Sequence, residues 1–233
     1  WVWRRDLFAG IVTAFVALFV IATPMLTLVV RSLRDRDGWT VAHYRALATT
    51  VGRSLPVPVW VAIRNSILVA MQATLIALVL GTLVALVVSR RPREPLARRG
   101  LRVLDALFML PLGVSAVTVG FGFLITLNRP PLDLRQSMIL IPIAQAIVAL
   151  PLVVRSLLPV LRAIDPRQRE AAATLGAAPG RVLRTVDGPF LVRGLGLGAG
   201  FAMATSLGEF GATSFLARLD RPTLPVVIFR LIG

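Results

Sequence analysis

The 233-residue sequence contains no cysteine and no lysine, and it has a single histidine, His43. Without cysteine there is no disulfide scaffold, no thiolate nucleophile and no cysteine-ligated zinc or iron–sulfur site. Without lysine the chain can form neither a phosphate-binding loop of the GxxxxGK[ST] type nor a Schiff base. One histidine excludes the zinc motifs that need two. We therefore expect no ATP bound by a P-loop, no metal site, no cofactor and no catalytic residue in this chain.

Charged residues are also scarce, at 16% against 56% apolar residues, and the apolar residues form long uncharged runs. The first run has 24 residues, more than the roughly 20 that cross the hydrocarbon core of a bilayer at about 1.5 Å per residue. We predict an all-α, polytopic helical membrane protein with about six transmembrane helices. The predicted spans are 7–30, 66–89, 104–127, 137–154, 190–207 and a sixth, truncated one that begins at Leu224.

All 26 basic residues are Arg, and their distribution predicts the orientation of the spans. Fifteen lie at the amino end, between the second and third spans or between the fourth and fifth, whereas nine lie on the opposite side. By the positive-inside rule, the amino end and the two Arg-rich loops are cytoplasmic. An alternative interpretation assigns the net charge of +15 to specific binding of nucleic acid or anionic lipid. We expect the lipid bilayer as a partner, and no nucleic acid.

The ends of the sequence carry a further expectation. It begins at Trp1 instead of Met, and it stops at Gly233 inside an apolar run. We expect a fragment of a longer polypeptide, with 1–233 forming a single transmembrane domain.

The loop after the fourth predicted span carries clear helix-capping signals. Asp165 can cap a helix whose first residue is Pro166, with Gln168 placed for a capping-box-like exchange and Gly176 placed to end the helix. This pattern predicts a short surface helix of about ten residues. A second helix is predicted from near Pro179 to a stop at Gly188 and Pro189. The alternative is an amphipathic loop on the membrane surface, but an alanine-rich face buries little apolar area.

This loop also carries a spaced motif. It resembles the EAA loop of the permeases of type I ATP-binding cassette (ABC) importers, whose pattern reads E-A-A-x3-G-x9-I-x-L-P. Val186 stands where the family has Ile, and Gly188 stands where it has Leu. The resemblance covers nearly the whole chain, from about Ile63 to Gly233. The residues at motif positions are Glu170, Ala171, Ala172, Gly176, Val186 and Pro189.

The resemblance implies a role for the loop and a set of partners. It implies that 159–189 is a cytoplasmic coupling loop whose helix docks on a separate ABC ATPase subunit. We expect this chain to be no enzyme and to have no nucleotide site of its own. It further implies a second permease half, fused or separate, and an extracytoplasmic solute-binding protein. The expected location is the plasma (inner) membrane of a bacterium.

A finer resemblance concerns the substrate. The segments 150–155, 206–213 and 223–233 resemble the second half of thiamine and iron(III) permeases, so thiamine or iron(III) is the expected substrate. The string at 208–213 is also similar to one in molybdate and sulfate permeases, which keeps oxyanion import as an alternative. A secondary transporter or channel is the alternative from another class. Such a protein needs charged residues at mid-membrane depth, and the first, second and fourth spans have none.

Polar residues in or beside the spans are candidates for the substrate path or its gate. Glu209 lies near the predicted outer interface between two glycines, where a carboxylate at a bend favours a cation. It could instead pair with Arg218 or Arg221. The other polar residues could equally join helices by hydrogen bonds. The candidates are Glu209, Gln145, Thr205 and Ser206.

Glycine recurs at every second position from Gly194 to Gly200. On a helix, any one face then holds two glycines that are four residues apart. We expect this face to pack closely against a neighbouring helix.

Overall fold

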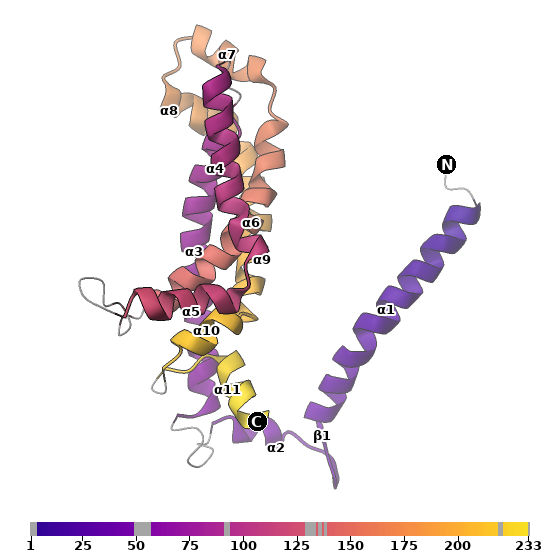
Figure 1. Ribbon diagram of the computed structural model, residues 1–233. Helices are drawn as coiled ribbons and strands as arrows, with labels where there is room; N and C mark the ends of the chain where they lie inside the picture. The colour runs from indigo at the N-terminus through magenta and orange to yellow at the C-terminus, as the bar shows by residue number, and fades with distance from the viewer. Residues whose placement is uncertain are drawn as a thin grey trace. The chain divides into compact units, whose positions relative to one another are not determined.

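The computed structural model describes residues 4–48, 57–90, 94–128, 134, 137, 139–218 and 221–232. The contacts between its residues divide the chain into two compact units, Trp1–Val51 and Gly52–Gly233. Each unit has its own arrangement of elements, drawn in Figure 1.

The first unit is built around one long helix that covers the predicted span 7–30. None of the apolar window of this helix is buried within the protein. A helix that is apolar on all sides is typical of a membrane span, whose side chains face lipid or other helices. The described elements are α1 (Arg4–Ser32), β1 (Arg34–Asp35), antiparallel β2 (Gly38–Trp39) and the short α2 (Ala42–Ala46).

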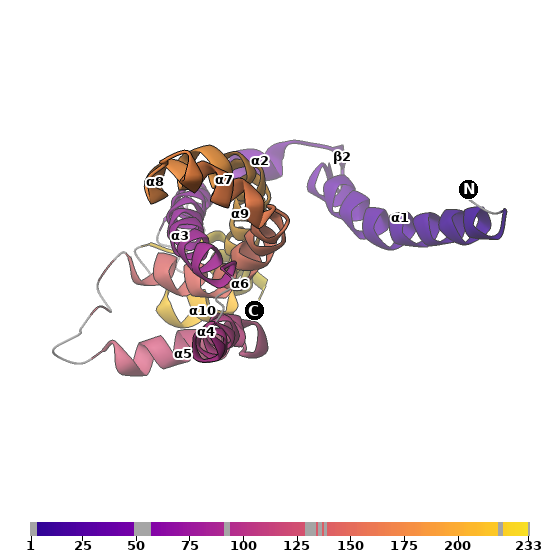
Figure 2. The ribbon, with the colours of Figure 1, turned by 90° about the horizontal axis from the view of Figure 1, so that it is seen from above.

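The second unit is a bundle in which α3, α6 and α9 pack side by side, as the two ribbon views show (Figures 1 and 2). Its described elements are α3 (Val59–Val88), α4 (Pro95–Gly113), α5 (Ala116–Thr126), α6 (Leu140–Arg162), α7 (Pro166–Thr174), α8 (Pro179–Val182), the π-helical η1 (Leu183–Asp187), α9 (Gly188–Leu207), α10 (Gly211–Leu216) and α11 (Leu224–Ile232).

The described part of the chain has four helices that are long and apolar enough to cross a membrane, or five if a bent pair counts as one span. These helices confirm the predicted all-α membrane architecture. α6 continues beyond the predicted end at residue 154 and stops at Arg162. The sixth predicted span corresponds to α11, of which nine residues are described.

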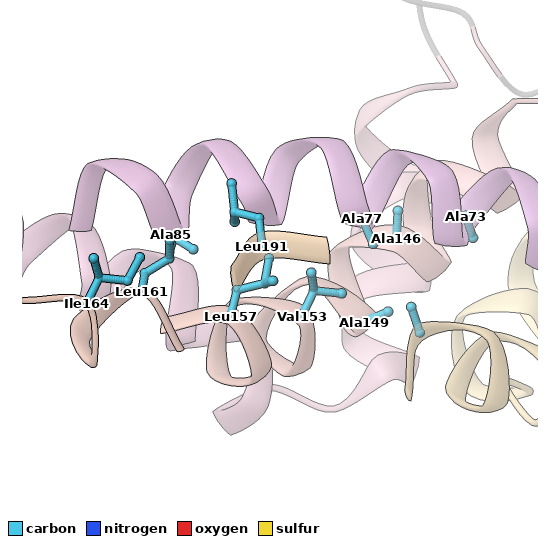
Figure 3. Packing of buried hydrophobic residues seen from close by; sticks show 11 residues of the cluster. Ala73, Ala77, Ala85, Ala146, Ala149, Val153, Leu157, Leu161, Ile164 and Leu191 are labelled. Carbon is cyan, nitrogen blue, oxygen red and sulfur yellow. The ribbon is translucent and has the colours of Figure 1, made fainter. Parts of the chain in front are cut away.

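Small side chains hold the three central helices together. Figure 3 shows alanines of α3 lying against alanines and larger apolar residues of α6, with α9 closing the cluster. Small residues let helix backbones approach closely, which is how helices associate where lipid supplies no hydrophobic driving force. The buried residues of this cluster are Ala73, Ala77, Ala85, Ala146, Ala149, Val153, Leu157, Leu161, Ile164, Leu191 and Ala202.

The glycines of α9 confirm the predicted close packing. Gly194 and Gly198 are buried against α6. A Cβ on Gly194 would lie 2.8 Å from Leu157 Cδ2, whereas a Cβ on Gly196 or Gly200 would meet nothing within 4 Å. One face of α9 therefore holds two glycines in contact with α6, four residues apart, and the intervening glycines face outward.

The third predicted span, 104–127, is formed by a bent pair of helices, α4 and α5, and the sequence analysis does not predict this bend. The helix axis bends by 101° between α4 and α5, and Figure 1 shows α5 running across the bundle axis. The chain turns at Val114 and Ser115, which have extended backbone angles, and Ser115 Oγ accepts a hydrogen bond from Val117 N at 3.3 Å to start a new helix. An N-cap of this kind begins a helix in a new direction.

The re-oriented α5 packs backbone to backbone against α10. A Cβ on Gly120 would lie 2.5 Å from Ala212 Cα and 2.6 Å from its carbonyl oxygen. These are backbone atoms, so they cannot rotate away as a flexible side chain does. Gly122, two residues along the same helix, has nothing within 4 Å of its Cβ position.

We expect Gly120→Ala to lower the melting temperature of the purified protein in detergent, because overpacking of this kind costs about 1–3 kcal/mol. Gly122→Ala is the matched control, since it brings the same gain in helix propensity of up to about 1 kcal/mol and no clash. Equal melting temperatures for the two variants would contradict the close contact of α5 with α10.

The prediction that the second loop helix ends at Gly188 and Pro189 is wrong. The chain stays helical from Pro179 through η1 into α9, so that 179–207 forms one continuous helical stretch. Proline lacks an N–H and its ring collides with the carbonyl four residues earlier, which normally ends or kinks an α-helix. A π-helical turn has a wider hydrogen-bond spacing. The π-helical turn η1 directly precedes Pro189, and the helix continues through this proline into α9.

Candidate functional site

The short helix α7 has the two ends that the sequence predicts. Asp165 Oδ1 accepts a hydrogen bond from Arg167 N at 2.9 Å, and Pro166 occupies the first turn. At the other end Gly176 has a φ of +78°, the left-handed conformation that favours glycine. Gly176 N donates to Ala173 O at 2.9 Å and Ala177 N donates to Ala172 O at 3.0 Å. This pair of bonds is a Schellman motif, which ends the helix sharply.

The outer surface of α7 is open to a partner. Glu170, Ala171 and Gly176 are exposed, and Ala172 is partly buried. Leu175, next to the terminal glycine, is 88% exposed. A large apolar side chain that points into solvent beside small residues is typical of a contact surface. The motif does not include Leu175, and only its position beside the helix-ending glycine points to it.

The two remaining motif residues lie elsewhere. Val186 is part of η1, is partly buried and packs against the central core cluster. Pro189 lies in the first turn of α9 and is exposed. Of the six predicted coupling residues, four therefore lie on α7 or at its end, and two lie where the loop rejoins the bundle. α7 and α8 occupy one end of the bundle (Figure 1).

Asp187, which the sequence analysis does not single out, joins α7 to the bundle. Its side chain is 0% exposed. Oδ1 accepts a hydrogen bond from Arg169 Nε of α7 at 2.7 Å, and Oδ2 accepts one from Arg90 Nη2, just after α3, at 3.3 Å. Arg169 Nη2 also donates to Leu161 O of α6 at 3.4 Å. A carboxylate can be buried when it is paired and hydrogen-bonded in this way.

This Asp187 junction connects three parts of the second unit: the exposed helix α7, the end of α3 and the start of α9. Arg169 is 18% exposed and Arg90 is 48% exposed in their side chains, so water screens the Arg90 contact more strongly. The bond from Arg169 of α7 is the shorter and less exposed of the two. No local sequence pattern points to this junction, because its partners are 18 and 97 residues away from Asp187.

At the opposite end of the bundle, Glu209 fixes the start of α10. Oε1 accepts a hydrogen bond from Ala212 N at 2.7 Å, and Oε2 accepts bonds from Thr213 N at 3.0 Å and Thr213 Oγ1 at 2.6 Å. The residue is buried. Both carboxylate oxygens therefore bind the first turn of a helix, where negative charge is stabilised. Each carboxylate oxygen of Glu209 therefore already accepts at least one hydrogen bond within the protein.

Gln145 continues the network from α6. Its Nε2 donates to Thr213 Oγ1 at 3.1 Å, while its Oε1 is buried and has no hydrogen-bond partner among the described residues. Ser206 Oγ is likewise buried and unpaired within the described part of the chain. Thr205, next to Ser206, is partly buried. The structure thus joins Gln145 to Glu209 through Thr213, and it places Thr205 and Ser206 in the last turn of α9.

Comparison with known proteins identifies relatives of this chain. No protein-family model matches it. The molybdenum transport system permease protein ModB is 32% identical over 147 residues in Escherichia coli strain K12, which is 57% of this chain and 64% of that protein. ModB of Haemophilus influenzae is 32% identical over 154 residues, 59% of this chain and 67% of that protein.

Two further relatives are named as permease proteins of other transport systems. The putative 2-aminoethylphosphonate transport system permease protein PhnU of Salmonella typhimurium is 32% identical over 142 residues, 55% of this chain and 49% of that protein. The sulfate transport system permease protein CysT of Salmonella typhimurium is 35% identical over 128 residues, 51% of this chain and 46% of that protein. The chain spans 64% of the length of Escherichia coli ModB and about half that of PhnU and CysT.

Proposed function

This chain belongs to the transmembrane permease subunits of type I ABC importers, and we propose that it forms the substrate path of such an importer in the inner membrane of a bacterium. The chain lacks lysine and therefore a P-loop, so the energy for transport comes from a separate ATPase subunit. A second permease half and an extracytoplasmic solute-binding protein complete the complex.

The observation that carries this proposal is the geometry of α7. The helix is short, capped at both ends and exposed along its outer face, with Leu175 projecting beside Gly176. A helix with satisfied ends is a rigid contact element, because its terminal N–H and C=O groups need no further partner. Glu170, Ala171, Ala172 and Gly176 contact the ATPase in this proposal.

The Asp187 junction gives the contact a mechanical route. A displacement of α7 by the ATPase is passed through Arg169 to Asp187, which begins the continuous path into α9, and through Arg90 to the end of α3. Val186 and Pro189 lie on this route and are not part of the contact surface. Packed helices respond to such a displacement by moving as rigid bodies.

We propose that the substrate is an oxyanion. The relatives are named for molybdenum, 2-aminoethylphosphonate and sulfate, and these names favour the oxyanion alternative over thiamine and iron(III). The hydrogen bonds of Glu209 agree with this choice, because its oxygens cap α10. The hydroxyl groups of Ser206 and Thr205 can donate to an anion, and Gln145 Nε2 has a second hydrogen besides the one that it donates to Thr213 Oγ1. We assign these three residues to the path.

Uptake into proteoliposomes tests the proposed function. We expect the permease, reconstituted with its ATPase and binding protein, to accumulate labelled molybdate or sulfate when ATP is supplied, and to accumulate neither thiamine nor iron(III). A non-hydrolysable ATP analogue is the control. Uptake by the permease alone, without an ATPase, indicates a secondary transporter or channel and contradicts the proposal.

A further inference from the structure

A basic pocket lies beside the Asp187 junction, within the second unit. Its volume is about 620 Å³, and it lies between the end of α3, the first turns of α4 and the end of α6. Arg98, Arg102 and Asp105 line it from α4, where spacings of four and three residues place them on one helix face. Arg90 and Arg162 line the other sides.

The charges of this basic pocket favour an anionic occupant. Four guanidinium groups and one carboxylate line it. Arg90 also contacts Asp187, which offsets part of its charge. Arg98, Arg102 and Arg162 are exposed, and an anion placed among like charges lowers the repulsion between them. Arg binds phosphate groups particularly well, because its planar guanidinium donates two parallel hydrogen bonds.

A second observation narrows the chemistry of that occupant. Asp105 Oδ1 is buried and accepts no hydrogen bond from any described residue. A bare inorganic anion is repelled by this carboxylate and leaves it unpaired. A ligand that carries a hydroxyl or amine donor next to its phosphate can pair with both the Arg groups and the Asp105 carboxylate, provided that the Asp105 side chain turns its buried oxygen toward the pocket.

The position of the pocket points to a lipid. α3 ends at Val88 and α6 ends at Arg162, so the pocket lies where membrane-spanning helices leave the apolar layer. Val88 and Leu101 supply apolar side chains to its lining. An acyl chain can lie along these residues while its headgroup binds the Arg groups. Basic pockets between transmembrane helices are a known means of holding anionic headgroups.

We propose that this pocket binds the headgroup of an anionic phospholipid that carries a hydrogen-bond donor, of the phosphatidylglycerol type. The phosphate binds Arg102 and Arg162, and a headgroup hydroxyl donates to Asp105. The inference does not depend on the proposed function, because the pocket belongs to the purified permease with or without an ATPase.

Lipid binding to the purified permease in detergent, measured by native mass spectrometry, tests this site. We expect phosphatidylglycerol to bind about tenfold more weakly to the Arg102→Gln/Arg162→Gln variant than to the wild type. Arg99→Gln/Arg193→Gln is the matched control, since it removes the same charge from exposed residues outside the pocket lining. If the double variant does not fold, each single variant is measured, with a smaller loss expected. Equal weakening by both pairs overturns the proposal.

Phosphatidylmethanol, which has the same phosphate diester charge and no hydroxyl, tests the role of Asp105. The wild type should prefer phosphatidylglycerol by several-fold, and the Asp105→Ala variant should lose this preference. Soluble glycerol 3-phosphate is the third probe. If it binds as tightly as the lipid and displaces it, the site serves a soluble phosphate ester and the lipid assignment is wrong.

Discussion

Asp187→Asn is expected to lower ATP-driven uptake at least tenfold while the permease still inserts and folds. The substitution keeps the shape of the side chain and removes the charge that binds Arg169 and Arg90. Hydrogen bonds to charged groups contribute about 1.5–3 kcal/mol, and about 1.4 kcal/mol corresponds to a factor of ten in an equilibrium. α7 then separates from the bundle, so ATP hydrolysis continues without transport. Uptake and ATPase activity, measured on the same proteoliposomes, report this uncoupling.

Two residues of α7 provide the matched control. Arg169→Gln removes the hydrogen bonds to Asp187 and Leu161 and should reproduce the loss of uptake. Arg167 lies two residues away on the same helix and is exposed, so Arg167→Gln changes the charge equally without touching the junction. Wild-type uptake by Asp187→Asn, with normal ATPase activity, would falsify the mechanical role of the junction and leave the permease assignment intact.

Gly176→Asp is expected to abolish uptake and co-purification with the ATPase, with membrane insertion unchanged. Gly176 has a φ of +78° and open space around its Cβ position, so no side-chain clash occurs. A left-handed conformation costs most L-residues about 1–2 kcal/mol, but Asp and Asn tolerate it better, so the backbone of the Schellman motif is disturbed only a little. The carboxylate also adds negative charge at the proposed contact. Uptake assays and affinity purification of the complex measure both effects.

Two control variants separate backbone from charge. Gly176→Asn has nearly the same shape, tolerates the left-handed conformation and carries no charge, so it should retain much of the uptake. Gly180→Asp places the same charge on neighbouring α8, where Gly180 has no left-handed backbone angle and nothing within 4 Å. If Gly176→Asp retains wild-type uptake and ATPase binding, α7 is not the contact element.

The parts that sequence predicts well depend on short-range chemistry. Asp165, Pro166 and Gly176 lie within one short helix and its caps, and each signal acts through a backbone group only a few residues away. The spans follow from composition, because long uncharged apolar runs have few other stable environments. Helix periodicity predicts that two glycines four residues apart share a face, and the structure shows that the packed pair is Gly194 and Gly198.

The parts that sequence does not reveal depend on long-range contacts. Nothing near Asp187 in the sequence distinguishes it from the other ten acidic residues, and only the fold brings Arg90 and Arg169 to it. The turn at Val114 and Ser115 accompanies the packing of α5 on α10, in which Gly120 lies against the backbone of Ala212. A proline usually ends a helix, and the π-helical turn that avoids this outcome has no reliable local signal.

The role of Glu209 illustrates an intermediate case. The sequence marks it as an unusual acidic residue beside the last complete span, and the structure places it in a buried network with Thr213 and Gln145. Its position before the helical start at Gly211 is a capping signal. Read as a cap, the same residue indicates a structural carboxylate and gives no support to a cation substrate.

The π-helical turn η1 also sets the rotational phase of α9. An α-helix advances about 100° per residue, and a π-turn inserts roughly one extra residue into this progression. From the last residue of η1 onward, Asp187, Leu191, Gly194 and Gly198 share a single buried stripe. Arg181 of α8 and Arg184 within η1 are exposed. Because of this one π-helical turn, the continuous helix 179–207 packs its glycines against the neighbouring helices in α9 and exposes basic side chains at its amino end.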